Sequence, residues 1–285
     1  MLKIIFIGFC LASVCQGFAQ TQRFIYQTTY KPDSLKNALI SESNALDIVG
    51  QNSVYYNYTK VGAKGEEKVV ESGNVKEGAE AAYLTYYVFK DKGKTEFFVY
   101  KGENAYQYEE KEKIKWQIKD SIIDYKGLFQ AQLAETDFGG RKWQVFFTTQ
   151  IPISNGPYKF GGLPGLIVKA VSTDLDYSIE LMEVLQVKDR LLEKPDNVMT
   201  LSRSKYLSLM NEHVKDPSKD IKTIFARYGV GMSHDVSIGD VMMKPAEMFK
   251  ITNQKAWEWM KTHNNPLEKG DVWLIFAPMK IVLPE

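Results

Sequence analysis

The pattern of apolar and polar positions divides the chain into a part with strand periodicity and a part with helical periodicity. From about residue 22 to residue 188, aromatic and β-branched residues alternate with polar ones, as in 24–30, which is typical of strands that bury one face. Where a polar turn separates two such runs, we predict a hairpin. These runs predict hairpins over 46–60 and 83–102 and further strands over 115–119 and 143–149.

The residues after 188 favour helices. Apolar residues spaced three or four apart predict helices over 202–214, 221–228 and 245–263, and Pro245 suits the first turn of the last one. The polar, glycine-containing stretch 62–82 predicts a long loop. The apolar run 272–277 predicts a last strand or a cover for the sheet.

No linker or internal repeat divides the chain, so we expect a single domain over residues 20–285. Strands followed by helices indicate an α+β fold that is mainly antiparallel β. We expect a strongly curved sheet or half-barrel with the C-terminal helices packed on one face.

The first residues have the features of a secretory signal peptide. A positive charge at Lys3 precedes an apolar run over 4–14, and the small residues Gly17 and Ala19 follow. We therefore predict cleavage after Ala19, with residues 1–19 as the signal peptide and a periplasmic or outer-membrane-associated mature chain. A lipoprotein attached through Cys15 is the alternative, which the bulky residue before that cysteine disfavours.

Composition excludes several classes of function. The 285 residues include 36 Lys plus Arg and 35 Asp plus Glu, so loss of Lys3 with the signal peptide leaves no net charge. A general nucleic-acid binder is then not expected, because phosphate neutralisation supplies most of its affinity. Both cysteines, Cys10 and Cys15, also lie in the signal peptide, which excludes thiol chemistry and cysteine-bound metals. The rest of the chain has no apolar run long enough for a membrane span, and no cofactor or metal is predicted.

Residues 137–170 combine a strand pattern with a high density of glycine and proline. The run Leu163, Pro164, Gly165, Leu166 fits a type II β-turn, because proline presets the first central φ angle and glycine accepts the positive φ of the second. Glycine also allows two backbones to approach closely. We expect a rigid turn that starts the next strand.

Residues 162–167 read GLPGLI, and the sequence resembles the GLPGLI protein family, which is named after these six residues. Flanking residues extend the resemblance: Trp116, Tyr125, Gly139, Arg141, Trp143, Ile151, Pro152, Gly156, Pro157, Lys159, Phe160 and, much later, Asn265 and Pro266. Phe129 stands where many relatives have a cysteine, so the resemblance brings no metal or redox role for that position. It implies a β-rich exported protein of Gram-negative bacteria without an assigned activity, similar by analogy to periplasmic lipoprotein carriers.

Histidines are the natural candidates for acid–base catalysis near neutral pH. His213 and His263 fall near the ends of predicted helices, where the helix dipole favours a positive charge. His234 lies beside Asp235 in a glycine-containing loop and is the best catalytic candidate of the three.

Two further groups could bind ions. Asp174 and Asp176 form a D-x-D pattern that offers oxygen ligands for calcium, with a solvated turn as the alternative. Arg141 could bind a carboxylate or phosphate through two N–H groups, or form an internal ion pair.

Aromatic residues make up 13% of the chain, enough to fill a core and to line a groove. The leading hypothesis is a non-enzymatic cell-envelope protein whose concave aromatic face engages an apolar ligand or an envelope protein partner. Its candidate binding residues supply aromatic lining, a polar anchor and a rigid turn: Trp116, Tyr125, Arg141, Trp143, Leu163, Pro164, Gly165 and Leu166. The alternatives are a periplasmic hydrolase centred on His234 and Asp235, and an outer-membrane assembly accessory that offers an exposed edge strand to its partner.

Overall fold

The strands form one large sheet and one small one. The computed structural model describes residues 21–58, 84–101, 104–188, 193–194, 197–233, 235–238, 241–272 and 281–282. The elements in chain order are β1 (Thr21–Tyr30), β2 (Ile40–Val49), β3 (Asn52–Asn57), β4 (Tyr86–Asp91), β5 (Lys94–Lys101), β6 (Asn104–Glu110), β7 (Gln117–Tyr125), β8 (Phe129–Phe138), β9 (Arg141–Thr148), β10 (Leu166–Ser172), β11 (Tyr177–Val187), β12 (Val198–Leu201), α1 (Arg203–Lys215), α2 (Lys219–Arg227), β13 (Val236–Ile238), β14 (Val241–Met243), α3 (Pro245–Thr262) and β15 (Ile281–Val282).

The large sheet is open and has twelve strands in the order β12-β6-β5-β4-β3-β2-β1-β11-β10-β9-β8-β7. Its pairs are antiparallel apart from the short β12, which runs parallel to β6. The predicted hairpins β2–β3 and β4–β5 are confirmed. Their turns contain Gly50 and Gly93 at positive φ, a conformation that glycine adopts at little cost.

The connection between β9 and β10 packs against both β4 and β9. Its Tyr158 ring packs edge-on against Tyr86 of β4, with the ring centres 5.1 Å apart. Its Phe160 ring packs against Trp143 of β9 at 5.0 Å. Both connection residues belong to the main core, at 2% and 0% exposure. The chain's own β9–β10 connection therefore covers part of the aromatic face that forms the main core.

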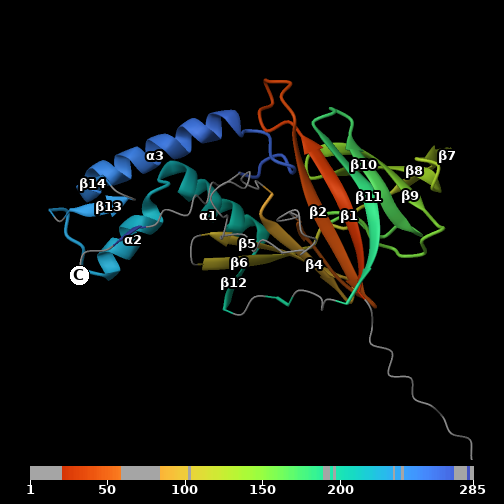
Figure 1. Cartoon of the computed structure of the whole chain (residues 1–285), viewed down its shortest axis with the longest axis horizontal. Helices are drawn as coiled ribbons and strands as arrows, with labels where there is room; N and C mark the ends of the chain where they lie inside the picture. The colour runs from red at the N-terminus through yellow and green to blue at the C-terminus, as the bar shows by residue number, and fades with distance from the viewer. Residues whose placement is uncertain are drawn as a thin grey trace, which may run out of the picture.

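Only one of the three helices joins this core, which corrects the expectation that the C-terminal helices pack together on one face. Tyr206 and Met210 of α1 are buried in the main core. The apolar faces of α2 and α3 instead meet each other, with Phe225 and Phe249 ring centres 5.6 Å apart. They lie with the small sheet β14-β13-β15 at the end of the molecule away from β7–β10 (Figure 1).

The helix boundaries agree with the sequence prediction. The Ser202 side chain caps α1 by accepting a hydrogen bond from the Lys205 N–H, and Pro245 occupies the first turn of α3. None of the helices in the described ranges is both long and apolar enough to cross a membrane. The predicted signal peptide, the predicted loop 62–82, most of the run 272–277 and His234 lie outside the described residues.

Candidate functional site

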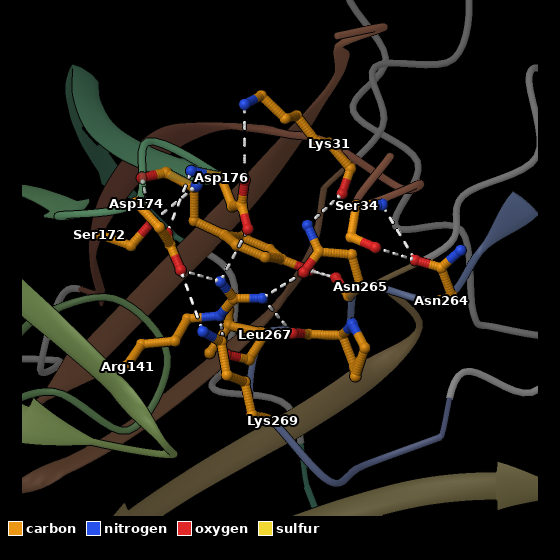
Figure 2. A network of polar contacts seen from close by, with 12 residues as sticks. Lys31, Ser34, Arg141, Ser172, Asp174, Asp176, Asn264, Asn265, Leu267 and Lys269 are labelled. Atoms are coloured by element: carbon orange, nitrogen blue, oxygen red, sulfur yellow. Dashed lines mark hydrogen bonds and ion pairs between the residues drawn. The ribbon is translucent and has the colours of Figure 1, made fainter. Parts of the chain in front are cut away.

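Arg141, at the start of β9, joins its own strand to two distant segments, 174–176 and 265–267 (Figure 2). Its Nη1 donates to the carboxylates of Asp174 (2.6 Å) and Asp176 (3.1 Å) in the β10–β11 turn. Its Nε donates to the Leu267 carbonyl, and its Nη2 donates to the Asn265 side chain and the Pro266 carbonyl. All five N–H groups of the guanidinium are thus used inside the chain, and the residue is 3% exposed.

The glycine pair before Arg141 allows the segment 265–269 to lie directly on the β8–β9 turn. Gly139 and Gly140 both have positive φ. A Cβ at Gly139 would lie 2.6 Å from Cγ of Glu268, and one at Gly140 would lie 2.9 Å from Cβ of Lys269. The Lys269 N–H donates to the Gly139 carbonyl at 2.7 Å. The two glycines and the late Asn-Pro element are therefore parts of one contact.

A buried group of charges lies behind this contact. Lys159, 5% exposed, donates to Glu110 at 2.8 Å and also to Glu268. Arg203, the first residue of α1, donates through one nitrogen to Glu268 at 2.8 Å and Asp271 at 2.5 Å. Burial favours the neutral form of Glu268, but Lys159 and Arg203 outweigh it and hold the pKa of Glu268 below its usual value. Burial and the nearby Glu268 charge raise the pKa of Asp271.

The GLPGLI segment is a close contact with β9 and not a type II turn, so that part of the prediction is wrong. Gly165 is not among the glycines at positive φ, whereas Gly162 is, at 86°. A Cβ at Gly165 would lie 2.1 Å from the Thr148 carbonyl oxygen. Glycine is required at 165 because the backbone of β9 occupies the space of a side chain, which confirms the expected close approach.

Lys90 of β4 binds the β9–β10 connection through its ammonium group. Its ammonium donates to the Asn155 side chain and the Gly156 carbonyl, both at 2.9 Å, and to the Phe160 carbonyl at 2.5 Å. These acceptors are all neutral. Burial lowers the pKa of Lys90 to about 7, since no carboxylate among these acceptors compensates the charge.

Trp116 and Tyr125 fix the two ends of β7, which is the outer strand of the sheet. The indole N–H of Trp116 donates to the Gly161 carbonyl at 2.8 Å, next to the GLPGLI segment. The hydroxyl of Tyr125 donates to the Leu181 carbonyl of β11 at 3.0 Å. Between these anchors, Ile118 and Ile122 are 49% and 59% exposed. Two of the predicted site residues thus position an exposed strand.

The other predicted site residues lie in or next to the core. Trp143 is 1% exposed and donates its indole N–H to the Phe138 carbonyl at 3.1 Å. Leu163 and Leu166 are buried, and Pro164 is exposed. The structure therefore brings Trp116 close to the GLPGLI segment, whereas Arg141 belongs to the separate network of Figure 2.

A polar cavity of about 580 Å³ opens beside the Arg141 network. It lies at the β8–β9 turn, the end of β6 and the start of α1. The lining residues are Glu110, Glu112, Asp137, Phe138, Gly139, Gly140, Arg141, Lys142, Arg203, Glu268 and Lys269. Sequence reasoning missed Glu110, Arg203 and Glu268, because nothing in their local pattern distinguishes them from surface charges.

The candidate catalytic and metal-binding residues are held in other contacts. Asp235 is exposed and pairs with Lys244 at 2.8 Å. His213 is 8% exposed; burial and the adjacent Lys101 charge lower its pKa to about 4, so it is neutral at pH 7. No group of three or more metal-ligating side chains occurs in the described part of the chain. Asp174 and Asp176, the candidate calcium ligands, bind Arg141 instead.

Part of this region is similar to a protein family of unknown function. Residues 84–169 match the model of a protein family of unknown function, described as Porph_ging. The matched range contains Trp116, Tyr125, Arg141, Trp143 and the whole GLPGLI segment. The match fits a bacterial family without a known activity.

Curated proteins and solved structures add little to this match. No curated protein matches the chain. Two crystal structures of PNGF-II, in space groups C2 and P21, share 14% and 15% sequence identity with it, with TM-scores of 0.48 and 0.47. Each overlap covers 67% of this chain, and 32% and 33% of the respective PNGF-II chains. The chain therefore spans about a third of the length of these structures.

Proposed function

We propose that this chain is an exported accessory protein of the cell envelope, of the GLPGLI type, that binds an extended segment of a protein partner along strand β7. The observation that carries the proposal is the exposed outer strand held at both ends by Trp116 and Tyr125. Export through residues 1–19, a periplasmic or outer-membrane location and a single domain over 20–285 belong to the same proposal.

The filled aromatic face favours a partner over an apolar ligand. In a half-barrel that carries lipid, the concave face has to be open or able to open. Here Tyr158, Phe160 and Leu163 of the β9–β10 connection occupy that face, and all are at most 2% exposed. Lys90 also holds the connection with three hydrogen bonds. The external surface is therefore the better place for recognition.

Strand β7 offers a partner both backbone and side-chain contacts. Within the described residues it pairs with β8 and with no other strand, so about half of its backbone N–H and C=O groups point away from the sheet. Ile118 and Ile122 add exposed apolar area on the same strand. An added strand would gain main-chain hydrogen bonds for affinity and alternate side-chain contacts for specificity.

The anchors of β7 reduce the free-energy cost of binding. A flexible edge strand would lose conformational entropy when a partner ordered it. Trp116 ties the beginning of β7 to Gly161, and Tyr125 ties its end to Leu181, so the strand is ordered before any partner arrives.

The irregular middle of β7 favours a dedicated partner over a second copy of the chain. The register between β7 and β8 shifts between Ile118 and Ile122, which places a bulge there. Bulges and charged residues on edge strands oppose unselective edge-to-edge pairing. Lys119, Asp120 and Asp124 supply such charges on this strand. A partner segment has to match both the bulge and the charges.

Site-specific photo-crosslinking tests this proposal in cells. A photoreactive amino acid replaces Ile122 on β7, and Leu39 serves as the matched control because it is an equally exposed apolar residue, at 60%, next to the inner strand β2. We expect one discrete adduct with another polypeptide from position 122 and none from position 39. The adduct is expected to disappear when Ile118→Lys is added, since a lysine blocks an edge strand.

Three outcomes would contradict the proposal: no adduct from β7, equal adducts from positions 122 and 39, or an adduct with a second copy of the chain. The last outcome is recognised by its doubled mass with purified protein alone. Recovery of a mature chain that still contains residues 1–19 would contradict the export part.

A further inference from the structure

Strand β11 has a neighbouring strand on both sides only over its first half. β1 pairs with it from Tyr177 to Val187. β10 pairs with it only over residues 178–180. Within the described residues, the stretch 184–187 therefore pairs with β1 alone and has no strand on its other side. We call this stretch the β11 open edge.

Two bulges end the pairing of β10 with β11 at the same level of the sheet. The register of β10 shifts at Val168, and that of β11 shifts at Met182. Before its bulge, β10 turns to its own connection, since the Ile167 N–H donates to the Asn155 carbonyl at 3.0 Å. Bulges commonly end strand pairing and are built features of a sheet. The separation of β10 from β11 is therefore part of the fold.

Two tyrosine hydroxyls fix the point where the two strands separate. Tyr26 of β1 donates to the Ile167 carbonyl of β10 at 2.8 Å. Tyr125 donates to the Leu181 carbonyl of β11 at 3.0 Å, and the Lys126 ammonium reaches the same carbonyl at 3.4 Å. The β7–β8 turn, which contains Lys126, thus lies at the beginning of the open edge.

The exposure of Val184 shows that a strand is missing beside it. Val184 lies opposite Phe24 of β1, and residues opposite each other share one face of a sheet. Phe24 is buried in the main core at 1% exposure, whereas Val184 is 48% exposed. A strand added next to β11 would place side chains over Val184.

The open edge also lacks the usual protection against strand addition. Residues 184–187 contain no charged residue and no proline, which are common devices for blocking an exposed edge. Strand β7 differs, because it carries Lys119, Asp120 and Asp124. The open edge therefore suits a segment that is itself uncharged.

We infer that the β11 open edge binds a single extended segment of a partner polypeptide, uncharged and apolar at alternate positions. Its backbone pairs with residues 184–187 as an added strand, and one row of its side chains covers Val184. A second copy of the chain fits less well, because each copy would bring its own β7–β8 turn and Lys126 to the same edge. This inference does not depend on the proposed partner binding at β7.

Calorimetry with a model strand tests the inference on the full mature chain. The probe is a capped heptapeptide of alternating threonine and valine, with one lysine added at each end for solubility. In two further forms, either all valine amides or all threonine amides are N-methylated. An added strand donates through alternate amides, and contact of the valines with Val184 fixes which ones. We expect one methylated form to bind at least about tenfold more weakly than the other. No heat of binding with millimolar parent peptide, or equal affinities of the two methylated forms, would overturn the inference.

Substitutions of exposed apolar residues locate the bound peptide. Val184→Lys is expected to weaken the parent peptide at least about tenfold, because a charge replaces the apolar contact. Leu39→Lys, at a residue that is 60% exposed next to the inner strand β2, is the matched control and should change nothing. Ile118→Lys on β7 should also leave the affinity unchanged. Loss of binding in Ile118→Lys but not in Val184→Lys would place the peptide at β7, which overturns this inference and leaves the β7 proposal intact.

Amide hydrogen exchange of the wild-type chain gives a second readout that needs no variant. Saturation with the parent peptide should protect alternate amides within 184–187 and leave the amides of β7 unchanged. Unchanged exchange at 184–187 in the saturated chain would overturn the inference.

Discussion

Replacing Arg141 gives the sharpest test of how the late segment 265–269 is held. Arg141→Met removes five hydrogen bonds and the charge that balances Asp174 and Asp176. Loss of one member of a buried ion pair costs about 3 to 5 kcal/mol. Because Asp174 is 32% exposed and keeps Lys269 at 3.4 Å, we expect the lower end, about 3 kcal/mol.

Urea unfolding followed by fluorescence measures this loss. Lys142→Gln changes the next residue of β9, which is exposed, and is expected to stay within about 0.5 kcal/mol of the wild type. The loss of unfolding free energy for Arg141→Lys should lie between the losses for Lys142→Gln and Arg141→Met, because lysine keeps the charge but has at most three N–H donors. A loss below about 1 kcal/mol for Arg141→Met would refute the role given to this side chain.

Amide hydrogen exchange adds a local measurement to the same variant. The Lys269 N–H is protected by its bond to the Gly139 carbonyl. If Arg141 holds the segment, this amide should exchange much faster in Arg141→Met, while amides in the centre of β1 change only with global stability. Equal acceleration at both places would show that Arg141 acts on the whole fold and not on this segment.

Three further predictions concern the β9–β10 connection and β7. Gly165→Ala places a Cβ 2.1 Å from the Thr148 carbonyl oxygen, so we expect at least about 3 kcal/mol of destabilisation in urea unfolding. Gly127→Ala is the control, because nothing lies within 4 Å of a Cβ there. It should cost only about 1 kcal/mol, from its positive φ. Lys90 has a folded-state pKa of about 7 against 10.5 as its ordinary value, so the unfolded chain binds more protons between these values. Unfolding free energy should therefore rise with pH from 7 to about 9.5, by up to about 1.4 kcal/mol per pH unit, and Lys90→Met should flatten this rise. Trp116→Phe keeps a ring beside Phe160 but loses the hydrogen bond to the Gly161 carbonyl, so we expect about 1 kcal/mol of destabilisation. Amide exchange in residues 117–119 should also become faster. An unchanged exchange pattern would disprove the role of Trp116 as an anchor of β7.

Local features of the fold could be predicted because their causes are local. The α1 helix follows from apolar residues at helical spacing together with the Ser202 cap, and the β2–β3 hairpin follows from two aromatic runs around Gly50. The density of glycine near residue 165 correctly indicated a close approach of two backbones. The predicted type II turn is wrong because glycine is required at 165 for a different reason, the close approach of the β9 backbone, which the sequence does not reveal.

The contacts that define the site could not be predicted, since they join residues far apart in the chain. Arg141 meets Asn265 across 124 positions, and Lys159 meets Glu268 across 109. Lys90 binds residues 155–160 from the other half of the sheet. Lys90 resembles an ordinary surface charge in its local pattern. The internal ion pair expected as one alternative for Arg141 is confirmed, but the sequence could not show which residues are its partners. The helices α2 and α3 likewise gave no sign that they would pack on each other rather than on the large sheet.

Amide hydrogen exchange of β7 in the complex with its crosslinked partner tests the central claim most directly. Strand addition forms hydrogen bonds to the outward-facing N–H groups of residues 117–124, whereas contact through side chains alone leaves these groups open to water. We predict that alternate amides of β7 exchange rapidly in the isolated chain and become protected in the complex. An intact complex in which the exchange of β7 is unchanged would contradict the claim that this strand receives the partner.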